Sequence, residues 1–134
     1  MFKRSVDELS AIVAATDRFF AEQQLDAAIR TPVDLAVEEL FVNMVQYNRG
    51  TDRSIRLYMQ VSGAALEVSL TDYDVDPFDP TKPPALDIDA PLAQRSPDGM
   101  GLYLVSKMVD SIRYEYRNRE SRVTFMKRVV PGHA

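Results

Sequence analysis

SIRLYMQVSGAALEVSLT, residues 54–71, contains two runs in which apolar and polar residues alternate, 54–61 and 65–71. Alternation with a period of two is typical of a strand that has one face on a core. A short turn containing Gly63 joins the two runs. Two alternating runs joined by a short glycine turn predict a β-hairpin.

Two amphipathic helices are predicted before this hairpin. Ser5 and Glu8 match a capping box at the start of the first helix, which ends near Gln24. Thr31 as N-cap and Pro32 at the first helical position predict a second helix that ends near Gly50. The residues expected to face inward are Leu9, Ile12, Val13, Phe19 and Phe20 in the first helix and Val33, Val37, Leu40, Phe41 and Met44 in the second.

After the hairpin, residues 72–97 hold six of the eight prolines and show no periodicity, which is typical of a long binding loop or lid. A third helix is predicted at 101–109, with Leu102, Val105, Met108 and Val109 inward, and a second hairpin at 111–117 and 121–130. This order predicts a single domain over 1–134 and a two-layer α+β sandwich. Its mainly antiparallel or mixed sheet of four to five strands is covered on one face by three helices.

The composition of the sequence excludes several classes of function. The net charge of −4 argues against direct nucleic-acid binding, which needs a basic surface. No cysteine is present, no apolar run is long enough to cross a bilayer, and the N-terminus lacks the apolar region of a signal peptide, so we expect a cytoplasmic protein without a membrane contact. Residues 107–128 are rich in Lys and Arg; this segment is either a docking surface for an acidic partner or a solvated strand face.

Three short elements are candidates for chemistry. In the second helix, Glu39, Asn43 and Tyr47 recur every fourth residue and form one row at the edge of the apolar stripe. An Asn oxygen can bind Mg²⁺, and a carboxylate one turn away can deprotonate a hydroxyl. Taken alone, a row of this kind more often marks only the polar border of a helix.

The other two elements follow the first hairpin. Asp72 comes where the second strand ends, in the Asp- and Pro-rich stretch 72–80, which is either a turn or a reader of an exocyclic amino group. This stretch lacks the Gly and distal Glu of a calcium loop. Gly99 and Gly101 precede the third helix, where backbone N–H groups can bind a phosphate, although such a pair also occurs in ordinary turns.

In order and spacing, these elements together resemble the three sequence boxes of the GHKL, or Bergerat-fold, ATPase superfamily. The closest resemblance is to the anti-sigma-factor serine/threonine kinases of the RsbW and SpoIIAB type. It covers roughly residues 5–130 and rests on Glu39 with Asn43, Asp72 with the run Pro77-Phe78-Asp79-Pro80, and Gly99-x-Gly101-Leu102-x-Leu104-Val105. Asp74 and Asp98 stand where the family has glycine, Tyr47 stands at a histidine position, and the N-terminal strand of the family is short or missing.

The resemblance implies a role for each matching residue. It implies that Glu39 is the general base, that Asn43 binds Mg²⁺ and the nucleotide, and that Asp72 binds the adenine amino group. The other nucleotide-binding residues that it implies are Phe78, Gly99, Gly101, Leu102 and Thr124. It also implies ATP and Mg²⁺ as cofactors, an anti-sigma-factor antagonist of the STAS type and a sigma factor or similar regulator as partners, and a homodimer.

Two functions therefore stand side by side. The first is a kinase that transfers phosphate from Mg-ATP to a serine of an anti-sigma-factor antagonist. The second is a catalytically weak or inactive regulator of the same fold that acts by partner switching alone. We do not expect the catalytic piece of a histidine kinase, because that function needs a helix that carries the phosphorylated histidine, and the only histidine in the sequence, His133, lies in the tail.

Overall fold

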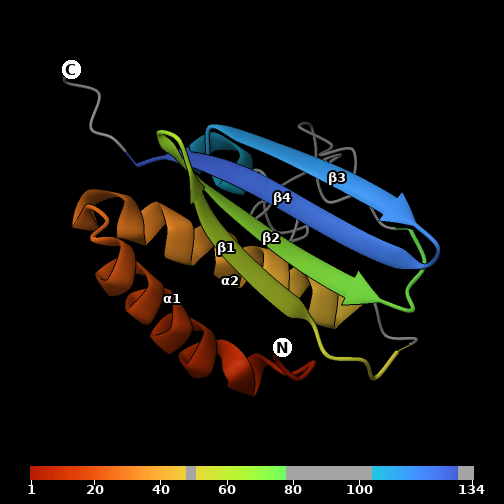
Figure 1. Ribbon diagram of the computed structural model, residues 1–134. Coiled ribbons are helices and arrows are strands. Elements are labelled where there is room, and N and C mark those ends of the chain that lie inside the picture. The colour runs from red at the N-terminus through yellow and green to blue at the C-terminus, as the bar shows by residue number, and fades with distance from the viewer. Residues whose placement is uncertain (48–50, 78–103, 130–134) are drawn as a thin grey trace, which may run out of the picture.

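The computed structural model describes residues 1–47, 51–77 and 104–129 (Figure 1). Two helices come first, followed by two hairpins, and residues 74–110 connect the first hairpin to the second. The elements are α1 (Leu9–Gln23), α2 (Arg30–Tyr47), β1 (Arg56–Ser62), β2 (Ala65–Tyr73), β3 (Ser111–Arg117) and β4 (Glu120–Arg128), with short 3-10 turns at Val6–Glu8 and Ala27–Ile29. Residues 104–108 are also helical and belong to the predicted third helix.

The four strands form one antiparallel sheet in the order β1-β2-β4-β3. Each predicted hairpin is present, and the pairing of β2 with β4 joins the two hairpins at the centre of the sheet. Beyond the edge strand, Phe2 forms an isolated antiparallel bridge with Ile55. The N-terminal strand, which the sequence predicted to be short or missing, is represented by this single bridge.

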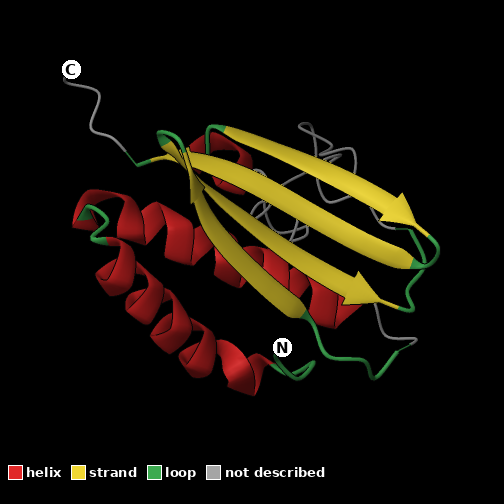
Figure 2. Cartoon of the chain, viewed as in Figure 1, coloured by secondary structure: helices red, strands yellow, loops and turns green. Residues whose placement is uncertain are grey.

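The helices lie on one side of the sheet, which confirms the two-layer α+β architecture (Figure 2). The core forms between them because alternate residues of the central strands point at the helices. All five residues expected to face inward from α2 are buried, whereas Val13 of α1 is 48% exposed, against the prediction. The fully buried core side chains include Val33, Val37, Leu40, Phe41, Ile55, Leu66, Val68, Leu70, Val105, Val123 and Phe125.

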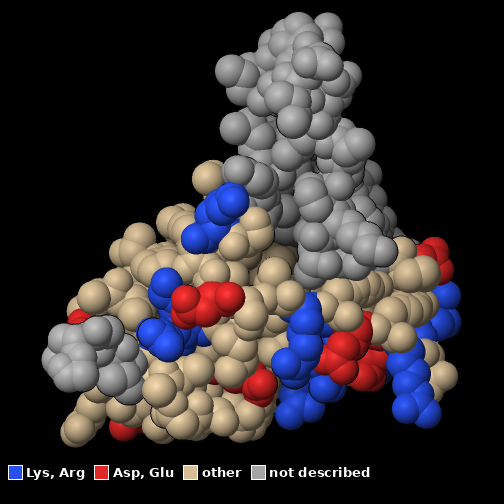
Figure 3. Space-filling view, turned by 90° about the horizontal axis from the view of Figure 1, so that it is seen from above, with Lys and Arg blue, Asp and Glu red and all other residues tan. Residues whose placement is uncertain are grey.

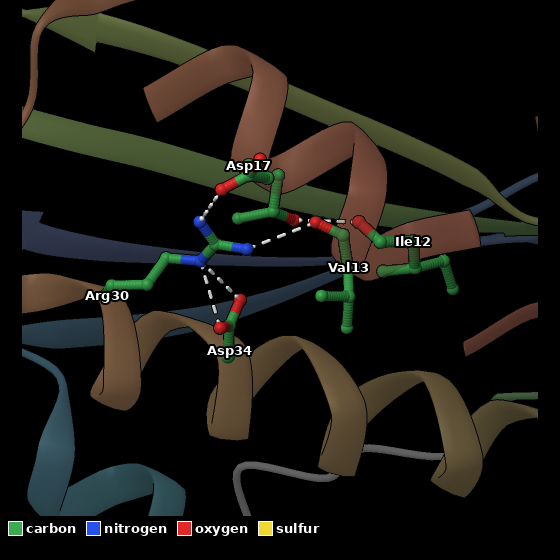
Figure 4. A network of polar contacts seen from close by, with 6 residues as sticks. Ile12, Val13, Asp17, Arg30 and Asp34 are labelled. Atoms are coloured by element: carbon green, nitrogen blue, oxygen red, sulfur yellow. Dashed lines mark hydrogen bonds and ion pairs between the residues drawn. The ribbon is translucent and has the colours of Figure 1, made fainter. Parts of the chain in front are cut away.

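A charged contact holds α1 against α2 (Figure 4). Arg30 donates to both carboxylate oxygens of Asp34 at 2.9 and 3.0 Å, to Asp17 of α1 at 2.9 Å and to the carbonyl of Val13 at 3.1 Å. Burial lowers the pKa of Arg30, but the hydrogen bonds with Asp17 and Asp34 outweigh it and raise the pKa above its usual value.

The start of α2 differs from the prediction. The helix begins at Arg30, so Thr31 is not its N-cap. Asp26 caps the preceding 3-10 turn instead, because its carboxylate accepts from the Ala28 N–H at 2.8 Å. Among the described residues, no helix combines the length and apolar character required to cross a membrane.

Candidate functional site

Helix α2 carries the first group of candidate residues. Asn43 is 5% exposed and Glu39 is half-buried, one turn before it on the same side of the helix. The Asn43 amide nitrogen Nδ2 is buried and has no hydrogen-bond partner within the described part of the chain. The third member of the predicted row, Tyr47, ends the helix, and its side chain lies outside the described atoms.

Asp72 lies near the end of β2 and is fully buried. It alternates with Leu66, Val68 and Leu70 of the core, so its side chain faces the helix layer. Its oxygen Oδ1 accepts from Arg4 Nη2, and Arg4 Nη1 donates to the carbonyl of Met44 in α2 at 3.0 Å. The carboxylate therefore lies beneath the sheet, joined to α2 through Arg4.

Ser121 is a further candidate site residue, which was not predicted from the sequence. It is the register partner of Asp72 in the neighbouring strand β4 and is 3% exposed. It alternates with Val123 and Phe125, so its hydroxyl is on the same face as the Asp72 carboxylate. Only the β2–β4 register reveals this neighbour, and nothing in the linear sequence states that register.

Thr124, expected to bind the nucleotide, lies on the other face of the sheet. Its register partner is Ser69, and the two hydroxyls are 2.9 Å apart. Both side chains line a polar pocket of about 340 Å³. Its other lining residues include Arg56, Tyr58, Glu67, Arg113 and Arg122. Strand alternation therefore separates Thr124 from Asp72 and Asn43, and the structure does not bring it into their site.

The segment after β2 is anchored to the β3–β4 turn. Asp74, at the family's glycine position, has φ of 59°, in the left-handed region that favours glycine. Arg119 donates to Asp74 and to Asp76, each at 3.0 Å, and the Tyr116 hydroxyl donates to the Val75 carbonyl at 2.7 Å. The backbone thus keeps a glycine-type conformation, and the Asp74 carboxylate is engaged by Arg119.

Basic side chains of β3 and β4 also form ion pairs with neighbouring carboxylates. Arg113 contacts Glu115 at 3.2 Å and Glu67 at 3.8 Å, and Arg122 lies 3.9 Å from Glu120. Figure 3 shows Lys and Arg side chains next to Asp and Glu over the visible face. The solvated strand face is therefore the interpretation that the ion pairs favour.

Four predicted site residues, Phe78, Gly99, Gly101 and Leu102, lie outside the described residues. The helix that follows Leu102 is present at 104–108, and Val105 and Val109 pack in the core. Among the described residues, the candidate site therefore consists of residues from α2, the end of β2 and the start of β4.

These residues offer a buried carboxylate, a neighbouring hydroxyl and, on α2, an amide with a carboxylate one turn away. A buried carboxylate and a hydroxyl suit the recognition of an amino group by hydrogen bonds. Asn43 offers one hard oxygen, which fits Mg²⁺ held mainly by phosphate oxygens and water. No group of three His, Cys, Asp or Glu side chains within the described ranges is placed to hold a metal ion.

Comparisons with known proteins agree with this architecture. A chain containing the RsbU and RsbW domains of Rv1364c from Mycobacterium tuberculosis superposes with a TM-score of 0.69 at 16% identity, over 97% of this chain and 32% of that one. The histidine kinase AdeS of Acinetobacter baumannii superposes with a TM-score of 0.54 at 12% identity, over 76% of this chain and 48% of that one. The blue-light activated histidine kinase EL346 of Erythrobacter litoralis superposes with a TM-score of 0.54 at 15% identity, over 78% of this chain and 32% of that one.

At these identities the likeness concerns the fold, and the chain spans about a third to a half of the length of these proteins. No curated protein matches the chain in sequence. The family model of the histidine kinase-like ATPase domain, however, matches residues 2–127. An ATPase domain implies a nucleotide site. The chain therefore belongs to the histidine kinase-like ATPase domain family.

Proposed function

We propose that this chain is a cytoplasmic regulatory protein kinase of the anti-sigma-factor type, which binds Mg-ATP and phosphorylates a serine of an anti-sigma-factor antagonist. The proposal rests on one observation: a chain of the ATPase family has Glu39 and Asn43 one turn apart on α2 and a buried Asp72 near the end of β2. The RsbW domain in the Mycobacterium tuberculosis neighbour supports the anti-sigma-factor type.

In this proposal each residue has one task. Asp72 accepts a hydrogen bond from the adenine amino group, with Ser121 beside it as a second polar contact. Asn43 would hold Mg²⁺, and the ion would supply charge neutralisation at the phosphates. Gly99, Gly101, Leu102 and Phe78 complete the nucleotide pocket.

Glu39 is the proposed base. The serine oxygen forms a bond to the γ-phosphorus, the bond to the β–γ bridging oxygen breaks, and ADP leaves. Glu39 takes the serine proton as the oxygen attacks. The half-buried position of Glu39, one turn from Asn43, places this carboxylate beside the proposed metal ligand.

The proposed partners follow the same family type. They are an antagonist of the STAS type, which supplies the serine, and a sigma factor or similar regulator that the same protein sequesters as a homodimer. No direct contact with nucleic acid is proposed, in keeping with the net charge of −4.

A second function, partner switching without phosphotransfer, is supported by two observations. Arg4 already occupies the Asp72 carboxylate, and a carboxylate stands at the glycine position 74. Both features lower the expected affinity for a nucleotide, since the first competes for an acceptor and the second adds negative charge near a polyanion.

Calorimetric titration with Mg-ATP separates these functions. The kinase requires heat of binding at millimolar ATP or below; no heat and no thermal shift would refute it. If ATP binds, Glu39→Gln should abolish phosphate transfer to an antagonist serine and leave the ATP affinity nearly unchanged. Glu38→Gln is the matched control, because Glu38 is the exposed neighbour on the same helix. A loss of ATP binding in Glu39→Gln contradicts the role as base.

A further inference from the structure

The N-terminal segment places a cation inside the candidate nucleotide site. Arg4 precedes the first helical turn, and its side chain is only 9% exposed. Its guanidinium lies between β2 and α2, with one nitrogen on Asp72 and another on the Met44 carbonyl at 3.0 Å. The same two elements carry the residues assigned to adenine and Mg²⁺ in the proposed function.

The contact uses one of the two oxygens through which the Asp72 carboxylate can accept a hydrogen bond from a purine amino group. Asp72 Oδ1 accepts from Arg4 Nη2 and also from the Tyr73 N–H at 3.1 Å. A carboxylate oxygen has two lone-pair sites, and these two donors occupy both. A further donor at this oxygen must therefore displace Arg4.

Arg4 is also held in a way that allows displacement. Its Nε is buried and has no hydrogen-bond partner among the residues that the structure describes, and burial lowers the pKa of its guanidinium. An unpaired buried donor weakens the bound position of the side chain. The segment is tied to the sheet by two backbone hydrogen bonds, between Phe2 and Ile55, each 2.8 Å long. Opening an isolated bridge of two hydrogen bonds requires far less free energy than global unfolding.

We propose that Arg4 is an affinity-setting residue of the candidate nucleotide site: it occupies Asp72 in the empty protein, and a nucleotide binds by releasing the N-terminal segment. This inference rests on the proposed function, because it takes Asp72 as the residue that reads the base. It assigns to the N-terminus a regulatory role, since a partner that holds or removes this segment changes nucleotide affinity.

The first test is calorimetric titration of wild type, Arg4→Met and Lys3→Met with ADP and with adenosine, which lacks the phosphates. Methionine keeps an unbranched apolar stem, shorter than the arginine side chain, and removes the competing donor. Arg4→Met should bind both probes about 10-fold more tightly, the effect expected of one charge-assisted hydrogen bond. Lys3→Met should match the wild type, because Lys3 is the exposed neighbour.

The remaining outcomes separate the two proposals. Equal or weaker binding by folded Arg4→Met overturns the inference and makes Arg4 a residue that positions Asp72. Absence of ADP binding in all three proteins refutes the nucleotide site itself, and the inference with it.

A second test uses the wild type, in case Arg4→Met leaves Asp72 uncompensated and does not fold. Saturating ADP should accelerate hydrogen exchange of the Phe2 and Ile55 amides, which donate in the terminal bridge. Unchanged or slower exchange at these two amides means that Arg4 stays in place, which also overturns the inference.

Discussion

Asp74 carries a prediction that can be worked from its backbone. Its φ of 59° lies in the left-handed region, where a β-carbon crowds the backbone carbonyl and glycine, which has no β-carbon, is favoured. At a position of this kind, alanine is less stable than glycine by roughly 1 kcal/mol or more. We therefore expect Asp74→Gly to be about 1 kcal/mol more stable than Asp74→Ala.

The comparison isolates the backbone effect because both variants lose the same contact. The 3.0 Å bond from Arg119 to the Asp74 carboxylate disappears in each, so its contribution cancels in the difference. Urea unfolding followed by circular dichroism gives the two free energies of unfolding. For a chain of this size, a difference of about 1 kcal/mol corresponds to a melting-temperature difference of roughly 4 °C.

Asp76 provides the matched control. It also accepts from Arg119 at 3.0 Å, and its φ is not positive. There the order should reverse, with Asp76→Ala at least as stable as Asp76→Gly, because glycine loses more backbone entropy on folding. If Asp74→Ala is as stable as Asp74→Gly, the glycine-type conformation at position 74 is not the one that the protein adopts.

The same position has a consequence for the proposed nucleotide site. Asp74→Gly and Asp74→Asn both remove a negative charge, so both should tighten Mg-ATP in a calorimetric titration. Tightening by glycine alone would assign the effect to the backbone, and tightening by neither would remove Asp74 as the cause of weakened binding.

The remaining predictions concern the core, a cap and the two faces of β4. Phe41→Ala should lower the free energy of unfolding by about 3–5 kcal/mol, measured in urea, because Phe41 is fully buried; a loss below about 1 kcal/mol would contradict its place in the core. Asp26→Ala should cost about 1 kcal/mol in the same assay, since it removes the hydrogen bond to Ala28, whereas Asp26→Asn should retain most of that stability. Ser121→Ala should weaken adenosine binding several-fold, and Thr124→Val should leave it unchanged, because the two hydroxyls lie on opposite faces of the sheet; the reverse result would place the base on the other face.

Local patterns in the sequence were sufficient for the elements of this fold. The alternation in 54–61 and 65–71 predicts β1 and β2 within a few residues, and the inward row of α2 is correct throughout. These features depend on the period of a helix or a strand, which is written in neighbouring residues. The start of α2 was less accurate, since Arg30 begins the helix and pairs with Asp17 of α1, a contact that no local pattern contains.

The sequence by itself determined the fold class, the two hairpins and the family resemblance, because periodicity and motif spacing are properties of the linear chain. The tertiary structure alone decided which side chains meet. It placed Arg4 on Asp72, 68 residues away, set Ser121 opposite Asp72, and put Thr124 on the far face. These outcomes depend on strand register and on long-range packing. A shift of one residue in register exchanges the two faces of a strand, so composition and spacing do not determine which side chains meet.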